Sequence, residues 1–409
     1  MDGNKIFQME YNSAGNVEKM NIIFFGQYSY PQGMAGTKRI QHAISALKKC
    51  QGIRISVVIL TQSSRDNTLT GSYMGINYKT ILGDLYGIKT VLFSPILCLK
   101  TCHVLKESFC PNQNNIIYNY GPPDLFNIGI LSYAKQLGYK IVFDIVEDYD
   151  TAMSISHSSS HKIKTFNIRF LVRYIKYWAA GIIVISSHLQ RKYQDLSRNQ
   201  IPVHYRPISV DFRHYSTSIS DFGDPVTLFY SGSFGIKDGL PLLLSAFDNV
   251  AARNSNVRLV LTGKGSREAM GATFSRIAGS PFKQRIEYKG YLNDDAYYST
   301  LNSIDIPCMT RIDSAYANAG FPFKLGEYLA SGKPVIASHI SDVSRFLVHK
   351  RDAILVKPGD CMDIANAVEY LLNHPEEARL IGESGREKAR VHFDYNEQGQ
   401  KLLNYLRSI

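Results

Sequence analysis

Short apolar runs alternate with stretches of helical periodicity along almost the whole chain. In the first half, the runs that we predict to be strands are NIIFFG (21–26), RISVVIL (54–60), KTVLFS (89–94), NIIYNY (115–120), KIVFDIVED (140–148) and GIIVIS (181–186). Because these runs are continuously apolar, they indicate strands that are buried on both faces, as in a parallel sheet covered by helices. Residues 21–215 are therefore predicted to form a doubly wound α/β domain, preceded by a leader over residues 1–20.

The same pattern restarts after the polar stretch STSISDFGD (216–224), which is typical of an interdomain linker. The strands predicted beyond it are VTLFYSGS (226–233), VRLVLTG (257–263), RIEYKGYL (285–292) and IPCMT (306–310). A length of 409 residues also exceeds what one hydrophobic core usually supports. We therefore expect a second Rossmann-like domain over residues 216–392 and a helix over 393–409 that could cross back to the first domain. Two such domains facing each other would form a central cleft, at the carboxyl ends of their strands, where open α/β sheets bind ligands.

Composition narrows the class of protein. Apolar residues make up 44% of the chain and charged residues 20%, which is ordinary for a folded soluble protein. No apolar run reaches the roughly 18 residues of a membrane helix, and the first twenty residues lack the apolar core of a signal peptide. We therefore expect a cytoplasmic chain. Cys98, Cys102 and Cys110 have neither zinc-site nor redox spacing, so we expect buried free thiols.

The formal net charge of +11 indicates an acidic partner: nucleic acid, anionic lipid or a phosphorylated substrate. No nucleic-acid-binding module is recognisable. The segment HKIKTFNIRFLVRYIKYWAAG (161–181) has five basic residues, no acid and many interleaved aromatic and aliphatic side chains. Such a helix could lie on a membrane surface, which would make the chain peripheral on the inner face of the plasma membrane. The alternative is a core-packed helix whose outer face is basic.

Glycine-rich loops follow two strands of the second half, YSGSFGIKDG (230–239) and TGKGS (262–266). Such loops let backbone N–H groups approach phosphate oxygens, and Lys237 would add positive charge. The chain has no Gly-x-x-x-x-Gly-Lys-Ser/Thr phosphate loop and no His/Cys cluster with metal spacing, so we expect no metal site.

The stretch NAGFPFKLGEYLASGKPVIAS (318–338) predicts a loop, a short helix and a strand. Pro322 suits the first helical turn and Gly332 suits the residue after the helix. Lys324 falls in the first turn, where free N–H groups favour an anion, and Glu327 lies on the same face. A ligand with a phosphate group and hydroxyl groups attached to it would account for both residues: Lys324 would contact the phosphate, and Glu327 would accept hydrogen bonds from the hydroxyls. The alternative is an exposed ion pair of little consequence.

In their order, these segments resemble the donor-binding half of the retaining GT-B glycosyltransferases of family four, the glycosyl transferases group 1. The resemblance rests on LFYSGSFGIKDGLPLLLSAF, LVLTGKGS, IEYKGYLNDDAYYSTL and FPFKLGEYLASGKPVIAS. In the first half, FGQYSYPQGMAGTKRI is similar to the glycine-rich loop of the family, and AAGIIVISSHL with PISVDF resembles its domain-end signatures. The resemblance implies a GT-B fold with two Rossmann-like domains and a nucleotide-diphosphate-sugar as co-substrate, without a cofactor or metal.

The resemblance also implies roles for individual residues. Lys237 and Lys324 would hold the donor diphosphate, and Glu327 would bind the ribose hydroxyls. The other residues expected to bind the donor are Gly232, Ser233, Gly263, Lys289, Gly290, Tyr291, Gly320, Phe321, Phe323 and Leu325. Two positions depart from the family pattern. Ala319 stands where a first glutamate is common, eight positions before Glu327, and Ser233 stands where an arginine is common.

The first half would bind the saccharide acceptor. The residues expected there are Gly33, Gly36, Arg39, Tyr120, Gly121, Glu147 and Asp148, with Asp144 on the same strand end. A carboxylate at that end could bind hydroxyl groups. The alternatives are that the carboxylates form a solvated loop end, that the glycines only turn the loop, and that Arg39 is exposed.

Together with the basic charge, the resemblance implies a metal-independent retaining glycosyltransferase that acts on a saccharide acceptor, expected to be lipid-linked, in the biosynthesis of a bacterial surface polysaccharide. Cations and N–H dipoles at the diphosphate would stabilise the negative charge that develops as the sugar leaves. Two alternatives stay open: a non-catalytic GT-B subunit that binds a partner enzyme or saccharide, and an NDP-sugar epimerase.

Overall fold

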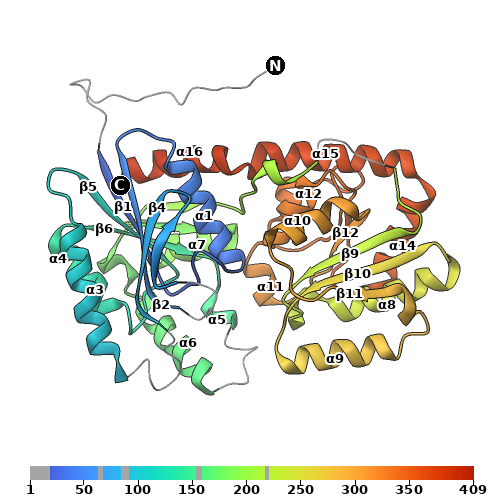
Figure 1. Ribbon diagram of the computed structural model, residues 1–409, viewed down its shortest axis with the longest axis horizontal. Coiled ribbons are helices and arrows are strands. Elements are labelled where there is room, and N and C mark those ends of the chain that lie inside the picture. Colours follow the sequence, from blue (N-terminus) through green and yellow to red (C-terminus); the bar gives the residue numbers. More distant parts are fainter. Residues whose placement is uncertain (1–18, 63–67, 84–91, 153–158, 217–220) are drawn as a thin grey trace. The chain divides into compact units, whose positions relative to one another are not determined.

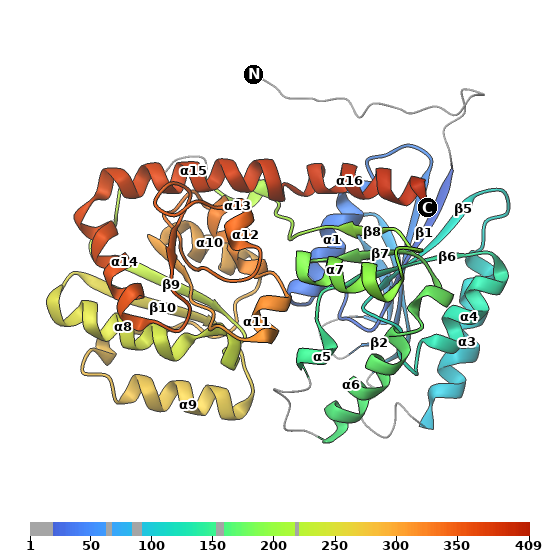
Figure 2. The ribbon, with the colours of Figure 1, turned by 180° about the vertical axis from the view of Figure 1, so that it is seen from behind.

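The computed structural model describes residues 19–62, 68–83, 92–152, 159–216 and 221–409, with the backbone alone for residues 62, 152 and 159–164. The chain divides into two compact units. The first unit consists of Met1–Pro207 with Gln398–Ile409, and the second of Ile208–Glu397. Figures 1 and 2 show the ribbon from opposite sides.

The division falls before the predicted boundary at residue 215, and packing explains the difference. Val210 forms a parallel bridge with Asp394. A Cβ atom on Gly326 would lie 2.6 Å from a side-chain atom of Ile208 and 2.8 Å from one of Val210, so both side chains pack directly against this glycine. Residues 208–215 therefore belong to the second unit. The predicted linker lies partly outside the described residues, which omit 217–220.

The first unit is built on an eight-stranded sheet with the order β3-β4-β2-β1-β5-β6-β7-β8. Its strands are β1 (Met20–Gly26), β2 (Ile53–Gln62), β3 (Thr70–Tyr73), β4 (Ile76–Gly83), β5 (Asn114–Tyr120), β6 (Lys140–Ile145), β7 (Ala179–Val184) and β8 (Val203–Tyr205). Every neighbouring pair is parallel except β3 and β4. All seven residues of β1 are buried, as its continuously apolar sequence predicted.

Helices cover the sheet of the first unit (Figure 1). They are α1 (Ala35–Leu47), α3 (Ser94–Ser108), α4 (Ile128–Leu137), α5 (Tyr149–Ala152), α6 (Ser159–Val172), α7 (Ser187–Leu196) and most of α16 (Tyr395–Ser408). One hydrophobic core joins β1 and α1 to Leu402, Leu403 and Leu406 of α16. The last helix of the chain thus completes the core of the first unit.

Two features of the first unit differ from the predictions. The predicted strand 89–94 is wrong at its described end, because Ser94 begins helix α3, while residues 84–91 lie outside the described residues. The hairpin of β3 and β4 was not predicted. Its turn residues Met74 and Gly75 both have positive φ angles, of 52° and 75°. Tight hairpin turns need such angles, which methionine rarely adopts, so the usual Asn-Gly or Asp-Gly signal is missing.

The second unit contains a six-stranded parallel sheet with the order β11-β10-β9-β12-β13-β14. The strands are β9 (Val226–Gly232), β10 (Val257–Gly263), β11 (Ile286–Tyr288), β12 (Ile306–Met309), β13 (Ile336–Ser338) and β14 (Ile354–Val356). The strand order reverses direction between β9 and β12. In open α/β sheets such a switch point is where ligands bind.

The helices of the second unit are α8 (Leu240–Arg253), α9 (Arg267–Ala278), α10 (Asp294–Ser303), α11 (Ala315–Ala319), α12 (Phe323–Ala330), α13 (Val343–Phe346), α14 (Cys361–Asn373) and α15 (Pro375–Phe393). Helix α12 lies where it was predicted, with each end one residue inside the predicted one. Pro322 is its N-cap residue, and Gly332, which follows the Ser331 cap, has a φ angle of 75°. The two sheets confirm the predicted pair of Rossmann-like α/β domains.

Candidate functional site

The carboxyl ends of β9, β10 and β12 meet at the switch point of the second sheet. Gly232 ends β9 and Gly263 ends β10 beside it. Gly263 has a φ angle of 127°, and a Cβ atom there would lie 1.9 Å from the carbonyl oxygen of Gly232. Only glycine permits this approach of the two loops.

Asp238 is the buried centre of this edge. It lies in the 3-10 helix Ile236–Asp238, and its Oδ2 accepts a hydrogen bond of 2.6 Å from Oγ of Ser233. Its Oδ1 lies 3.4 Å from Nζ of Lys324 and 3.7 Å from Nε of Arg311. Burial raises the pKa of the Asp238 carboxyl. The two cations and the Ser233 hydrogen bond lower it by more than burial raises it, so the net pKa lies well below the usual range. Asp238 is therefore ionised at neutral pH.

Lys324 occupies the first turn of α12, with its ammonium group over the edge of the sheet. Its Nζ lies 4.2 Å from the centroid of the Tyr230 ring, a cation–π contact. A Cβ atom on Gly232 would lie 2.7 Å from Nζ, so glycine at that position leaves room for the ammonium group. Burial lowers the pKa of Lys324 to about 8, even though Asp238 acts to raise it.

The site holds more positive than negative charge. Lys237 precedes Asp238 and places its Nζ 4.3 Å from the Tyr316 ring centroid. With Arg311 and Lys324 it makes three cations around one carboxylate, a formal charge of +2. Arg311 is buried, and its Nε has no hydrogen-bond partner among the described residues. A buried surplus of charge at N–H-rich loops favours a bound anion.

Arg311 was not predicted from the sequence. It is the second residue after β12, in the loop whose Ile312 N–H donates to the carbonyl oxygen of Lys237. The signal that could have identified it is a basic residue directly after a buried strand, at the same sheet edge as the glycine-rich loops.

Glu327 lies one turn after Lys324 on the partly exposed face of α12. Its Oε2 accepts a hydrogen bond of 2.8 Å from the hydroxyl of Tyr297. The next residue, Tyr328, is buried and its hydroxyl accepts a hydrogen bond from the Ser231 N–H, which fixes α12 against the end of β9. The predicted pair therefore shares one face of a helix that is anchored beside the switch point.

The other predicted donor residues fall into two groups. Lys289, Gly290 and Tyr291 form the loop after β11, and the carbonyl oxygen of Gly290 accepts hydrogen bonds from the Gly263 N–H and from Thr262. The loop therefore lies at the same sheet edge.

The second group precedes or begins α12. Phe321 and Leu325 are buried in the core, so their side chains are unavailable to a ligand and any contact would come from their backbone. The carbonyl oxygen of Gly320 accepts a hydrogen bond from Ser341, and Phe323 is partly exposed at the start of the helix.

In the first unit, the structure brings Gly36 and Tyr120 together. A Cβ atom on Gly36 would lie 2.6 Å from the Tyr120 hydroxyl oxygen, so the start of α1 packs against the end of β5. Gly121 follows with a φ angle of 95°, and a Cβ atom on Gly33 would clash with Thr37. Close packing therefore requires glycine at Gly33, just before α1, and at Gly36, in the first turn of α1.

Arg39 and Asp144 are buried, which contradicts the expectation that they line the acceptor side and also the alternative of an exposed Arg39. Arg39 donates from Nε and Nη2 to the Asp144 carboxylate at 2.8 and 2.9 Å. Tyr118 donates to the same carboxylate at 2.5 Å, and Arg206 donates to Tyr118 at 3.0 Å. Both residues are therefore structural rather than ligand-binding.

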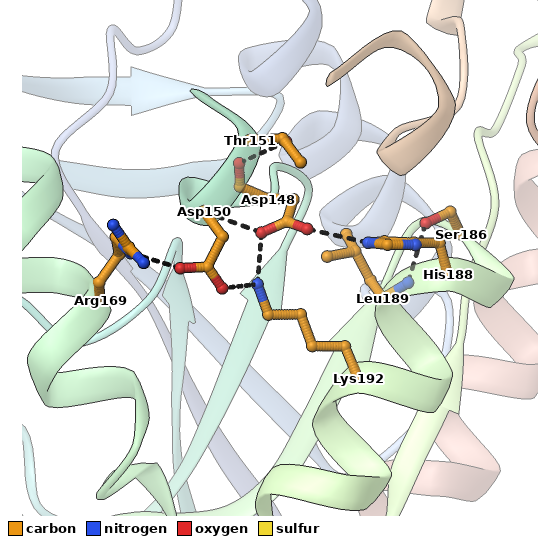
Figure 3. Close-up of polar contacts among 8 residues, drawn as sticks. All are labelled: Asp148, Asp150, Thr151, Arg169, Ser186, His188, Leu189 and Lys192. Atoms are coloured by element: carbon orange, nitrogen blue, oxygen red, sulfur yellow. Dashed lines mark hydrogen bonds and ion pairs between the residues drawn. The ribbon is translucent and has the colours of Figure 1, made fainter. Parts of the chain in front are cut away.

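Asp148 is the member of the acidic strand end that gathers polar partners (Figure 3). Its Oδ2 lies 2.8 Å from Nε2 of His188, and its Oδ1 pairs with Nζ of Lys192. Burial raises the pKa of the Asp148 carboxyl, but hydrogen bonds from Lys192 and His188 lower it below its usual value. Glu147 beside it is partly exposed.

In the ranges that the structure describes, the chain has no candidate metal cluster, no disulfide and no helix that could span a membrane. Among the described residues, no group of three or more His, Cys, Asp and Glu side chains could hold a metal ion. All six cysteines are free, but Cys98, Cys102 and Cys110 are only partly buried, so the prediction of buried thiols is wrong for these three. In the part of the chain that the structure describes, every helix is too short or too polar to cross a bilayer.

Comparison with known proteins assigns this site to a family. Residues 225–374, which carry the switch point and α12, match the family described as glycosyl transferases group 1. The second unit is a glycosyl transferases group 1 domain. This confirms the family resemblance that the loops and the helix of the second half predicted.

Curated relatives of this group 1 domain are distant. A phosphatidyl-myo-inositol mannosyltransferase of Mycobacterium leprae is 24% identical over 42% of this chain and 44% of its own length. A GDP-mannose-dependent monoacylated alpha-(1-6)-phosphatidylinositol monomannoside mannosyltransferase of Corynebacterium glutamicum is 22% identical over 75% of this chain and 80% of its own. The chain spans less than half the length of the first curated relatives that it matches.

Solved structures with a similar fold cover nearly the whole chain. The crystal structure of HepE from Anabaena in complex with UDP and glucose has a TM-score of 0.75 and 17% identity, and covers 95% of this chain and 100% of its own. Sucrose-phosphate synthase from Thermosynechococcus elongatus has a TM-score of 0.72 and 14% identity, over 96% of this chain and 98% of its own. The predicted GT-B fold is confirmed.

Proposed function

We propose that this protein is a retaining, metal-independent glycosyltransferase that moves a sugar from a nucleotide-diphosphate-sugar to a saccharide acceptor. The observation that carries the proposal is the surplus of two positive charges around Asp238, at the switch point of a group 1 domain. The diphosphate of a nucleotide sugar carries two negative charges, so it would neutralise this surplus.

Lys237, Arg311 and Lys324 would contact the diphosphate, together with N–H groups of the loops after β9 and β10. These groups are in place before the reaction, so they would stabilise the charge that grows on the leaving diphosphate in the transition state. Arg311 would supply the cation that is missing at Ser233. Glu327 would accept hydrogen bonds from the ribose hydroxyls.

Uracil and guanine are the first bases to test for the donor. HepE was crystallised with UDP, and the corynebacterial relative is named as GDP-mannose-dependent. Base recognition would involve the backbone of the loop from Lys289 to Tyr291, which lies at the same sheet edge as Gly263.

The acceptor would be a lipid-linked saccharide at the inner face of the plasma membrane, in the biosynthesis of a bacterial surface polysaccharide. Two relatives carry names that place their substrates on phosphatidylinositol lipids, and the net charge of +11 suits an anionic surface. Gly36, Tyr120 and the loop at Glu147 and Asp148 are the parts of the first unit that we assign to this acceptor.

The test is a thermal-shift and calorimetric screen of UDP, GDP, ADP and CMP and their sugar conjugates on the wild type and on Glu327→Ala. A ligand that binds only the folded state raises the melting temperature by mass action. We expect one nucleoside diphosphate to stabilise the wild type, with a smaller shift for the variant. If no nucleotide bound to the wild type, the proposal would be overturned, and a non-catalytic GT-B subunit would be the better explanation of this protein.

Turnover distinguishes the enzyme classes. A transferase releases the nucleoside diphosphate in an acceptor-dependent way, whereas an NDP-sugar epimerase produces a new or free sugar without any acceptor. Product analysis of the matched donor, with and without saccharide acceptors, therefore separates the proposal from the epimerase alternative.

A further inference from the structure

A cavity of about 170 Å³ lies in the first unit between α5, α6 and α7. Its lining residues are Tyr149, Asp150, Arg169, Val172, Arg173, Lys192, Tyr193 and Leu196. A water molecule takes up about 30 Å³ of liquid volume, so the cavity can hold a polar group of several heavy atoms. None of the residues assigned to the nucleotide sugar lines it.

Three cations and one carboxylate line this cavity. Lys192 bridges Asp148 and Asp150, and Arg169 pairs with Asp150 (Figure 3). These pairs occupy the two carboxylates of the network. Arg173 is exposed, and no ion pair of Arg173 is found among the described residues. With both carboxylates counted, the formal charge is +1, which matches a phosphodiester group.

The segment that supplies Arg169 and Arg173, from α6 through the 3-10 helix Ile175–Tyr177, also presents aromatic side chains to solvent. Phe166 is 63% exposed, Phe170 54%, Tyr174 43% and Tyr177 59%. The rings of Phe170, Tyr174 and Tyr177 form a continuous row, with centroids 5.3 Å apart for Phe170 and Tyr174 and 6.3 Å apart for Tyr174 and Tyr177. The other face of the same segment is buried in the core through Ile168, Leu171 and Ile175.

Exposed aromatic residues interleaved with arginine and lysine are typical of helices that lie in a membrane interface. The alternative for this segment was a helix that only packs against the core and has a basic outer face. Such a helix would not explain why four aromatic rings are exposed. Arg169, Arg173 and Lys176 lie between or beside those rings in sequence, and Arg guanidinium groups suit phosphate oxygens.

We infer that α6 and the residues up to Tyr177 form a docking surface for an anionic lipid bilayer, on which the cavity takes the phosphate of a lipid headgroup. The aromatic row would lie among the headgroups while Arg173, at the rim of the cavity, contacts the phosphate. This inference deepens the membrane contact of the proposed function and needs neither the donor site nor turnover.

The test is flotation of the full chain with two kinds of vesicle, at low salt and without nucleotide. One kind contains phosphatidylcholine alone, and the other equal parts of phosphatidylcholine and phosphatidylglycerol. We expect the wild type to float with the anionic vesicles only. Reversing one basic charge near such a surface changes two charges, each worth about 1 kcal/mol, so Arg173→Glu should lower the bound-to-free ratio by roughly tenfold or more.

Arg191→Glu is the matched control, because Arg191 is exposed on the neighbouring helix α7 and does not line the cavity. We expect this variant to stay within about threefold of the wild type. Phe170→Ser should weaken flotation without changing the net charge. Phe170, Arg173 and Arg191 are all exposed, so we expect the three variants to fold, and thermal melting would confirm this.

Absence of wild-type flotation would overturn the docking surface, and equal losses in Arg173→Glu and Arg191→Glu would overturn the role of the cavity. A second arm measures the thermal shift that inorganic phosphate causes. A shift that depends on Arg173, with no flotation, would assign the cavity to a free phosphate and overturn the lipid. Because nucleotide binding is measured separately, failure of the donor site and failure of this surface are distinguishable.

Discussion

Lys324 and Asp238 form an ion pair of 3.4 Å at the end of a parallel sheet, with the lysine ammonium also over the Tyr230 ring. The pair is unequal, because burial holds the pKa of Lys324 down at about 8 while that of Asp238 stays well below its usual value. The lysine therefore changes its charge just above neutral pH and the aspartate does not.

The first prediction concerns the pH dependence of nucleotide binding. Without ligand, Lys324 loses its proton as the pH rises through about 8, and the site then attracts a diphosphate less strongly. We expect the affinity for the matching nucleoside diphosphate to fall by up to about tenfold between pH 7 and pH 9. In Lys324→Arg, whose guanidinium stays charged, affinity should be nearly constant over that range. Calorimetric titrations at several pH values would show this, and a parallel decline in both proteins would contradict it.

The second prediction concerns Arg311. Loss of charge-assisted hydrogen bonds, at about 1.5–3 kcal/mol, should make Arg311→Gln bind the nucleoside diphosphate roughly tenfold to a hundredfold more weakly. Binding of the free nucleoside should change little, since it has no phosphate. The control is Arg345→Gln, because Arg345 is on α13 with about half of its side chain exposed. Equal weakening for nucleoside and diphosphate would show that Arg311 supports the fold of the site instead.

The third prediction separates the ribose from the phosphates. Glu327→Ala should lower the affinity for the nucleoside diphosphate by roughly tenfold or more, since hydrogen bonds to a carboxylate are lost. The same variant should bind inorganic pyrophosphate as the wild type does. If pyrophosphate binding fell as much, Glu327 would not act through the ribose.

The fourth prediction concerns the stability of the first unit. Arg39→Met should lower the free energy of unfolding by about 3–5 kcal/mol, because it leaves the Asp144 carboxylate buried without its main partner. The double variant Arg39→Met, Asp144→Leu should recover part of that loss. Urea unfolding followed by circular dichroism measures both. A single variant as stable as the wild type would mean that Asp144 finds another counter-ion.

The fifth prediction concerns His204, whose ring stacks on Tyr405 with centroids 4.8 Å apart. Burial is the largest cause that lowers the pKa of His204, the nearby Arg206 and Arg39 lower it as well and Asp144 acts to raise it, and the net pKa is about 4. The unfolded chain then binds a proton near pH 6.5 that the folded chain does not. Stability is therefore full above about pH 6.5 and decreases as the pH falls toward 4. His204→Phe keeps the stacked ring and should remove part of this decrease in melting temperature; identical pH profiles would contradict the assignment.

Much of the fold could be predicted because its strands are continuously apolar and its turns carry glycine and proline. Helix α12 shows this best: Pro322 and Gly332 marked its ends, and Lys324 and Glu327 share its partly exposed face. Local sequence determines such features. The hairpin at Met74 was missed because its turn lacks a typical turn residue.

The rest depends on partners that are distant in sequence. Arg39 and Asp144 are 105 residues apart, and each alone reads as a polar residue near a loop that could bind a ligand. Arg311 likewise looked like one of many basic residues until the structure placed it within 3.7 Å of Asp238. Sequence patterns give the edge of the sheet at which a residue lies, but not the charge that it meets there.

The core of the first unit includes Leu402, Leu403 and Leu406, although the preceding residues Ile208–Glu397 form the second unit. During synthesis, the ribosome therefore makes nearly all of the first unit, then the whole second unit, and only then the helix that closes the first core. The unit that begins first is completed last. A nascent chain halted before residue 402 would contain every residue of the second unit, but would expose the face of β1 and α1 that α16 covers, where a chaperone could bind.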